Sequence, residues 1–215
     1  MPHITLRDHN ISRLQSDDSF RNVLFMITPT YSLPFISQEA LISGCISGRA
    51  DYQKLLFHKY APTMFAVCLG YAPDYHQAED FLQEGFIKVF NKLHQYANKG
   101  SFEGWLRTIF VNNSIEALRK NKKWYELFPN DQSPQLVDHT NILDHLATQE
   151  LLQSIQKLPA GYRTIFNLYI IEGYSHKEIS KMLEISEGTS KSQLSRARIA
   201  LQRIVKIREN QLENI

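Results

Sequence analysis

The stretch that most constrains the fold lies near the C-terminus, at residues 174–198, and reads YSHKEISKMLEISEGTSKSQLSRAR. Ser175 and Glu178 have the spacing of a capping box, in which a serine hydroxyl and a glutamate carboxylate satisfy free backbone amides at a helix start. Ser186 is a suitable N-cap for a second helix, and only about three residues separate the two helices, as in a helix-turn-helix. The sequence therefore predicts two short helices joined by a tight turn.

The second of these helices has two contrasting faces. Its apolar stripe, at helical spacing, consists of Leu194, Ala197, Leu201 and Val205. Its opposite face is polar and basic, with two further polar residues on the flanks: Thr189, Ser192, Arg196 and Arg203, flanked by Lys191 and Gln193. Small polar side chains with Arg and Lys are suited to groove entry and phosphate contact, which predicts binding to duplex DNA. An ordinary helical hairpin with a solvated basic face is the alternative.

Two positions depart from this pattern. Glu184 stands where such turns usually carry glycine, and Ser190 falls on the inner stripe, where an apolar residue is expected. A buried serine hydroxyl can hydrogen-bond back to its own helix, so we expect Ser190 to be tolerated there.

Basic residues are concentrated in two segments that an acidic one separates. Residues 181–208 carry seven Lys and Arg against two Glu, and residues 105–123 carry five against one. Residues 124–143 have no Lys or Arg and hold three acidic residues. This distribution indicates two surfaces for a polyanion and a connector that stays off it.

Helical periodicity dominates the chain and strand alternation is essentially absent, so we expect an all-α protein. Two prolines and a weak pattern mark the acidic segment as a flexible linker between two small helical domains, the C-terminal one a helix-turn-helix. The expected units are a loosely ordered extension at 1–36, a helical domain at 37–123, the linker at 124–143, the helix-turn-helix domain at 144–208 and a tail at 209–215.

Several functions are disfavoured by what the sequence lacks. Cys45 and Cys68 form no CxxC pair and sit in apolar surroundings, which predicts buried free thiols in a reducing cytoplasm. No apolar run approaches the roughly 18 residues of a membrane span, and the N-terminal segment lacks the features of a signal peptide. The eight histidines are scattered, without HExxH, a glycine-rich phosphate loop or a nucleophile elbow. We therefore expect no enzyme activity, metal, cofactor or small-molecule substrate.

The segment AEDFLQEGFIKVFNKL predicts an amphipathic helix in the N-terminal domain. Its apolar face consists of Leu82, Phe86, Val89 and Leu93. Its other face is acidic and amide-rich around one isoleucine, and consists of Asp80, Gln83, Glu84, Ile87 and Asn91. Such a face suits a protein contact better than a DNA contact, although a simply solvated face is the alternative.

The loop HQYANKGSF leads into another helix that starts near Phe102. Four of its side chains lie within about 60° of one another by the 3.6-residue turn, namely Trp105, Thr108, Asn112 and Arg119. With Tyr96 and Phe102 nearby, these side chains can stack on unpaired bases and hold phosphates. A position in the core is the alternative for Trp105.

Three stretches, AEDFLQEGFIKVF, FEGWLRTIFVNNSIEALRK and LPAGYRTIFNLYIIEGYSHKEISKMLEISEGTSKSQLSRARIAL, together resemble the extracytoplasmic-function group of bacterial sigma factors. The resemblance runs from about Leu41 to Arg208 in the family's order and spacing, and no stretch resembles the extra domains of a housekeeping sigma factor. It implies a factor that binds core RNA polymerase and directs promoter-specific transcription initiation in the cytoplasm. It also implies an anti-sigma factor as a partner.

In the N-terminal domain, the resemblance implies that Asp80, Gln83, Glu84 and Ile87 contact the clamp helices of the beta-prime subunit. The loop from His94 to Phe102, with Tyr96, Asn98 and Lys99, would capture a flipped base of the melted −10 element. The helix carrying Trp105, Thr108, Asn112 and Arg119 would contact the surrounding promoter. The family often has arginine at the position of Thr108, whereas here Arg107 is its neighbour.

In the C-terminal half, the resemblance implies that the acidic linker threads through polymerase near the RNA exit path. The last helices would rest on the beta flap and read the double-stranded −35 element through Ser175, Lys177, Glu187, Thr189, Lys191, Ser192 and Arg196. The alternative function is an autonomous helix-turn-helix regulator that binds operator DNA without polymerase, usually as a dimer.

Overall fold

The computed structural model of the protein describes residues 36–120 and 154–212, and every regular element in these two ranges is helical. The expectation of an all-α protein is therefore confirmed for the described part of the chain. The elements are α2 (Gln38–Ile46), α3 (Ala50–Tyr71), α4 (Tyr75–Lys92), η1 (Leu93–Gln95), α5 (Phe102–Arg119), α7 (Ala160–Phe166), η4 (Asn167–Ile171), α8 (His176–Leu183) and α9 (Glu187–Leu212).

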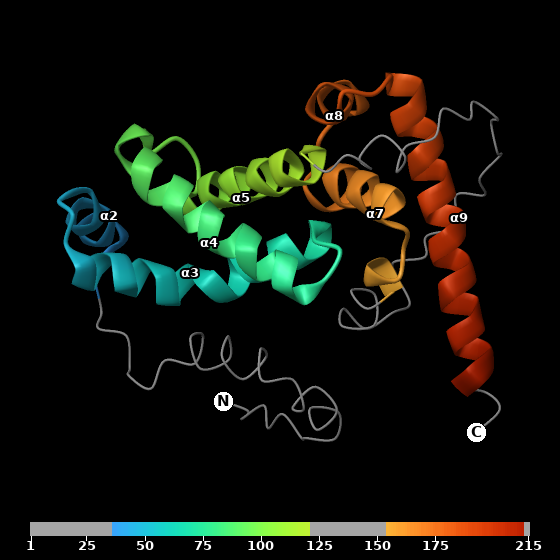
Figure 1. Ribbon diagram of the computed structural model, residues 1–215, viewed down its shortest axis with the longest axis horizontal. Helices are drawn as coiled ribbons and strands as arrows, with labels where there is room; N and C mark the ends of the chain where they lie inside the picture. Colours follow the sequence, from blue (N-terminus) through green and yellow to red (C-terminus); the bar gives the residue numbers. More distant parts are fainter. Residues whose placement is uncertain (1–35, 121–153, 213–215) are drawn as a thin grey trace.

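Helices α2 to α5 form one domain, in which α3, α4 and α5 pack against one another and α2 covers one end of α3 (Figure 1). Short polar side chains start three of these helices by accepting a backbone amide three residues on: Ser37 for α2, Asp74 for α4 and Ser101 for α5. The centre is filled by fully buried side chains, among them Leu56, Met64, Phe81, Leu106 and Phe110.

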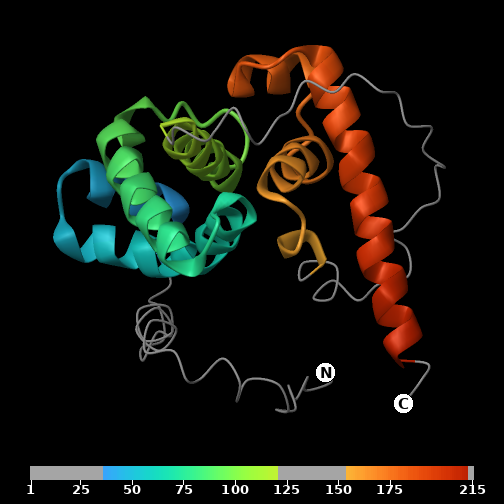
Figure 2. The ribbon, with the colours of Figure 1, turned by 45° about the vertical axis from the view of Figure 1, so that its right-hand side comes forward.

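Helices α7 to α9 form the second domain. The predicted apolar stripe of α9 is confirmed, since Leu194, Ala197, Leu201 and Val205 are all buried. Helix α7 packs on α9, and α8 lies across the N-terminal end of α9 (Figures 1 and 2). Between α7 and α8, residues Asn167–Ile171 form a π-helical turn, closed by the Glu172 amide donating to the Asn167 carbonyl at 2.9 Å.

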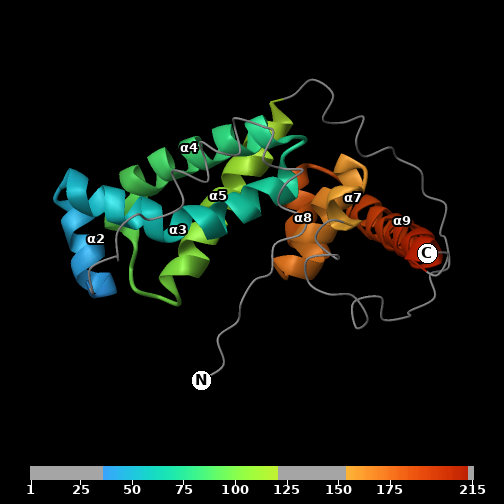
Figure 3. The same cartoon turned by 90° about the horizontal axis from the view of Figure 1, so that it is seen from below.

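The two domains touch each other. Helix α7 contacts α3, and α8 contacts α5, so the second domain lies against one end of the first while α9 extends away from it (Figures 2 and 3). Helix α9 continues to Leu212 and so enters the segment expected to be a tail. The expected linker at 124–143 lies outside the described residues, as does nearly all of the expected extension at 1–36.

Candidate nucleic-acid and polymerase interfaces

Helix α4 has the two faces that the sequence predicts. Leu82, Phe86 and Val89 are buried against the neighbouring helices, as is Leu93 just beyond the end of α4. Asp80, Gln83, Glu84 and Ile87 are all exposed, and Ile87 has an exposed fraction of 61%. An exposed isoleucine within an acidic and amide surface is a suitable anchor for another protein, because its burial there would add apolar contact.

Three aromatic rings meet where the loop after η1 joins α5. Tyr96 lies 5.0 Å from Phe102 and 5.4 Å from Trp105, measured between ring centroids, and Phe102 stacks on Trp105 at 5.7 Å. Phe102 is 1% exposed, whereas Tyr96 and Trp105 are partly buried. Phe102 thus belongs to the core beneath the other two rings, and its predicted contact with DNA lacks an accessible surface.

The loop before α5 turns at two residues with positive φ, Asn98 at 54° and Gly100 at 81°. The Tyr96 hydroxyl donates to the Gly100 carbonyl at 3.1 Å and so closes this turn. Asn98 and Lys99 are exposed on it. The loop therefore presents an amide and an ammonium group beside the aromatic rings.

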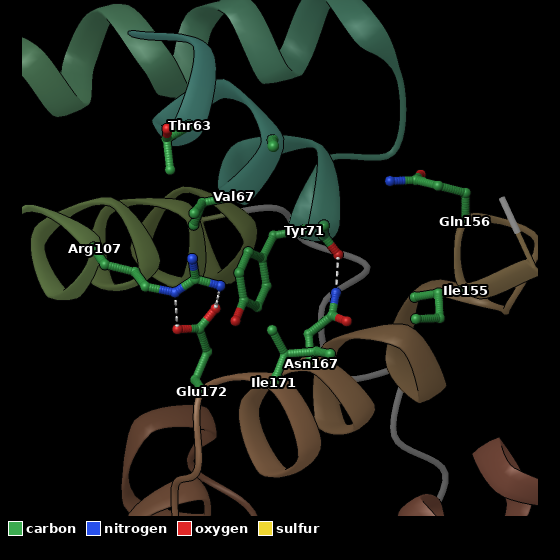
Figure 4. A pocket seen from close by; sticks show the side chains of 11 residues that line it. Thr63, Val67, Tyr71, Arg107, Ile155, Gln156, Asn167, Ile171 and Glu172 are labelled. Atoms are coloured by element: carbon green, nitrogen blue, oxygen red, sulfur yellow. Dashed lines mark hydrogen bonds and ion pairs between the residues drawn. The ribbon is translucent and has the colours of Figure 1, made fainter. Parts of the chain in front are cut away.

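On α5, Thr108, Asn112 and Arg119 are exposed, and the Thr108 hydroxyl donates to the Gly104 carbonyl at 3.0 Å. The two arginines of this region already have partners in the other domain. Arg107 is paired with Glu172, and Arg119 is paired with Glu184. The C-terminal domain therefore pairs with Arg119 of the predicted promoter face and with its neighbour Arg107 (Figure 4), while Thr108 and Asn112 stay exposed.

The predicted helix-turn-helix is present from α8 to α9. Both hydrogen bonds of the capping box form: the Glu178 amide donates to the Ser175 hydroxyl, and the Ser175 amide donates to the Glu178 carboxylate at 2.8 Å. Glu184 ends α8 in the left-handed conformation, with φ of 56°. Such turns usually carry glycine because they need this conformation. Glutamate at this position therefore adopts the same backbone conformation that glycine would.

The exposed surface of α9 differs from the predicted one at two positions. Thr189 is 6% exposed, because its hydroxyl lies 2.8 Å from that of Ser186, which also caps the Thr189 amide at 2.9 Å. Gln193, predicted on the flank, is fully buried. The placement of Thr189 on the outer face was therefore wrong. The other predicted −35 contacts keep accessible surface. Four of them are exposed, namely Ser175, Lys177, Glu187 and Lys191, and two are half-buried, namely Ser192 and Arg196.

Ser190 is buried as predicted, but its hydroxyl does not bond back to its own helix. It lies 2.8 Å from Nδ1 of His176, whose ring stacks on Tyr169 with centroids 4.4 Å apart. Burial, then the charge of Lys191, lowers the pKa of His176, against an opposing effect of Glu187 and a smaller lowering by Arg198. The neutral ring of His176 on α8 thus contacts both Tyr169 of the π-helical turn and Ser190 of α9, and so links these three elements.

This contact leads to a prediction about stability. In a double-mutant cycle with Ser190→Ala and His176→Ala, we expect a coupling of about 0.5–1.5 kcal/mol in the free energy of unfolding, the usual net value of one hydrogen bond. Because the folded-state pKa is lowered, the stability from neutral His176 is present above about pH 6.5 and declines as the pH falls below it. Urea denaturation at several pH values measures both effects.

The matched control is a cycle of Ser192→Ala with His176→Ala. The Ser192 hydroxyl donates to the Thr189 carbonyl of its own helix at 3.1 Å, so its coupling to His176 should be near zero. Equal coupling in the two cycles would refute a specific His176–Ser190 bond.

Cys45 and Cys68 are free and buried, as predicted, and burial raises their pKa values to about 11 and about 12. No group of three or more His, Cys, Asp or Glu side chains in residues 36–120 and 154–206 could hold a metal ion. Among the helices described, none combines the length and apolar character that a membrane span requires.

A helical domain with an exposed acidic and amide face and an aromatic, basic edge, followed by a helix-turn-helix domain, is the arrangement of a bipartite DNA-binding protein. Comparison with protein families identifies both halves. Residues 56–124 match sigma-70 region 2, and residues 148–201 match sigma-70 region 4.

Individual relatives agree. ECF RNA polymerase sigma factor SigE of Mycolicibacterium smegmatis is 30% identical over 152 residues, which are 66% of this chain and 57% of that protein. SigW of Bacillus subtilis is 31% identical over 156 residues, 67% of this chain and 83% of that protein. A solved structure of the sigma factor RpoE with the anti-sigma factor NepR from Bartonella quintana is similar at 24% identity and a TM-score of 0.44, over 72% of this chain and 96% of that one. The chain belongs to the extracytoplasmic-function sigma factors of bacterial RNA polymerase.

Proposed function

We propose that this protein binds core RNA polymerase in the cytoplasm and directs it to promoters, without catalysis of its own. The observation that carries the proposal is the match to regions 2 and 4 of sigma-70 in one chain and in that order. An autonomous operator-binding regulator is not favoured, because a helix-turn-helix domain alone would not account for the region 2 match.

In region 2, the exposed face of α4 with Ile87 binds the clamp helices of polymerase. Its acidic and amide side chains would then face the polymerase and not DNA, whose phosphates the carboxylates would repel. Tyr96 and Trp105, supported from below by Phe102, stack on an extruded −10 base, while Asn98 and Lys99 contact it or its backbone.

In region 4, α8 and α9 read the −35 element in the major groove while this domain rests on the polymerase flap. Lys191 and Arg196 contact phosphates and base edges, and Ser175, Lys177, Glu187 and Ser192 surround them at the N-terminal ends of the two helices. Thr189 contributes indirectly, since its hydroxyl is held by Ser186 at the start of α9. An anti-sigma factor that covers these surfaces would regulate the protein.

The test begins with the promoters, because the bases read at −10 and −35 must be known before specificity is measured. Sequencing RNA 5′ ends gained on overexpression identifies them, and transcription with purified core polymerase plus this protein should start at the same sites. We expect Arg196→Ala to weaken −35 duplex binding about 10-fold, the usual loss for one base-edge or phosphate contact, while core polymerase binding is retained.

Arg203→Ala is the control, because it removes the same charge from the same helix beyond the region 4 match. Its effect on −35 binding should be clearly smaller than that of Arg196→Ala. Failure of the wild-type protein to bind core polymerase in a pull-down would refute the proposed function, and equal loss of core binding in Arg196→Ala would refute the role given to that residue.

A further inference from the structure

His176 lies where the two helices of the helix-turn-helix meet. It is the first residue of α8 and stands between two proposed −35 contacts, Ser175 and Lys177. One face of its imidazole ring stacks on Tyr169, with centroids 4.4 Å and planes 24° apart, and its Nδ1 atom lies 2.8 Å from the hydroxyl oxygen of Ser190. These contacts hold the ring, which is nevertheless only half-buried. A titratable group thus has a defined position within the proposed DNA interface.

The surroundings of His176 disfavour a positive charge on its ring in the free protein. Burial has the largest effect in lowering its pKa, Lys191 adds to this effect, Glu187 opposes it, and Arg198 adds a smaller lowering. On α8 itself, the carboxylate of Glu178 is bound to the amide and hydroxyl of the N-cap residue. The positive end of the helix dipole also disfavours a cation there. The ring is therefore mainly neutral at pH 7.

Duplex DNA would reverse this balance. It carries one phosphate charge per about 1.7 Å of its axis, and the proposed contacts Ser175, Lys177 and Lys191 would bring that charge close to the ring. A phosphate paired with Lys191 offsets the repulsion that an imidazolium meets, and a phosphate next to the ring attracts it directly. An opposite charge within about 4–6 Å shifts a pKa by roughly 1–3 units toward the charged form. The pKa of His176 should therefore be higher in the DNA complex than in the free protein.

Ser190 can hydrogen-bond to both forms of the ring, because a hydroxyl is both a donor and an acceptor. With the neutral ring, the hydroxyl either donates to Nδ1 or accepts from it. With the imidazolium, both ring nitrogens carry hydrogen, so Nδ1–H donates to the Ser190 oxygen. The hydroxyl hydrogen can then turn to a carbonyl of the preceding turn of α9, as buried helical serines commonly do. Since Ser190 occupies Nδ1, it is Nε2 that can meet a phosphate.

We propose that His176 is a further contact of the −35 element: it takes up one proton from solvent when the duplex binds, and its Nε2–H donates to a backbone phosphate. The proton returns to solvent when the duplex dissociates. This inference rests on the proposed function of the C-terminal domain, because it requires that α8 and α9 bind the duplex.

The proposal gives the pH dependence of binding a definite sign. The complex holds the proton more tightly than the free protein, so the affinity for the duplex increases as the pH falls. The increase begins as the pH falls below about 7 and is complete below the lowered pKa of the free protein. A difference of about one pKa unit between the two states gives a gain of up to about 10-fold.

The first measurement is the affinity of the full-length protein for a duplex with its −35 element, by fluorescence anisotropy from pH 8 to pH 5.5. The affinity of the wild type should rise by up to about 10-fold more than that of His176→Gln, whose amide can still bond to Ser190 but does not titrate. His76→Gln is the matched control, because it removes a 72% exposed histidine from α4 and should follow the wild type. Circular dichroism at each pH confirms that all three proteins remain folded.

The second measurement follows the His176 ring itself in the wild type. Carbon-13 labelling of the histidine ring gives one nuclear magnetic resonance signal for each histidine, and the signal that is lost in His176→Gln identifies His176. Titration of this signal with and without the duplex gives the pKa of His176 in the two states. The value should be about one unit higher in the complex, a difference that a purely structural role of the ring would not produce.

Two results would overturn the proposal while leaving polymerase binding and transcription normal. One is a pH profile of the wild type equal to that of His176→Gln, and the other is a pKa of His176 that the duplex leaves unchanged or lowers. A wild-type protein that binds core polymerase but no −35 duplex at any pH would instead refute the proposed role of the C-terminal domain, and this contact with it.

Discussion

Gly85→Ala is expected to lower the free energy of unfolding by about 3 kcal/mol, at the upper end of the range for overpacked cores. A Cβ at Gly85 would lie 2.2 Å from Cε1 and 2.4 Å from Cδ1 of Phe110. Phe110 cannot move aside easily, because it is fully buried and packs edge-on against Phe86 with ring centroids 5.1 Å apart. Helices α4 and α5 would have to separate, which loosens the core under the proposed polymerase and −10 surfaces.

The measurement is urea denaturation followed by far-ultraviolet circular dichroism, with Gly188→Ala as the matched control. The nearest atom to a Cβ at Gly188 is the Ser186 hydroxyl at 3.6 Å, an ordinary contact. Replacing a helical glycine with alanine there should therefore add up to about 1 kcal/mol through helix propensity alone. If Gly85→Ala were as stable as the control, the close approach of α4 and α5 would be wrong.

Gly85 also illustrates which features the sequence could not provide. From the sequence alone, a glycine inside the predicted amphipathic helix only lowers the stability of that helix. The residues around Gly85 in the sequence do not indicate that the ring of Phe110 packs against it. The same holds for Arg163, whose acceptor on Ala72 is 91 residues away. Contacts of this kind depend on how helices pack, and helical periodicity carries no information about them.

Features that depend on a few neighbouring residues could be predicted. The capping box at Ser175 and Glu178, the two faces of α4 and the apolar stripe of α9 all follow from spacing within one or two turns. The helical wheel was wrong for Thr189, which is buried and whose hydroxyl contacts that of Ser186. Phe102 was expected beside the base-stacking side chains because of its place at the end of the loop, but it is buried beneath Tyr96 and Trp105.

Ser190 shows a mixed outcome. Periodicity correctly predicted its burial, and the left-handed conformation of Glu184 fits the turn that the spacing indicated. Its partner His176 lies 14 residues away on α8, so the sequence offered only a bond within its own helix. The helical periodicity thus predicted the buried position of the Ser190 hydroxyl, whereas its hydrogen-bond partner depends on how α8 packs on α9.

The largest expected effect on function comes from Ile87→Lys, which should weaken binding to core polymerase at least about 30-fold, the loss typical of a central interface residue. Ile87 is 61% exposed on an otherwise acidic and amide surface. A large apolar side chain left in water on such a surface becomes favourable only when a partner buries it, and lysine would bring a charge into that contact. Fluorescence anisotropy of the labelled protein titrated with core polymerase measures the loss.

Ile46→Lys is the matched control, because Ile46 is a 53% exposed isoleucine on a different helix, at the end of α2. Both substitutions are at exposed positions and should change the free energy of unfolding by no more than about 0.5 kcal/mol, so a difference in polymerase binding cannot come from unfolding. Equal affinities for the two variants would contradict the assignment of α4. If binding were lost only in Ile87→Lys, polymerase must engage the exposed face of α4 around this residue.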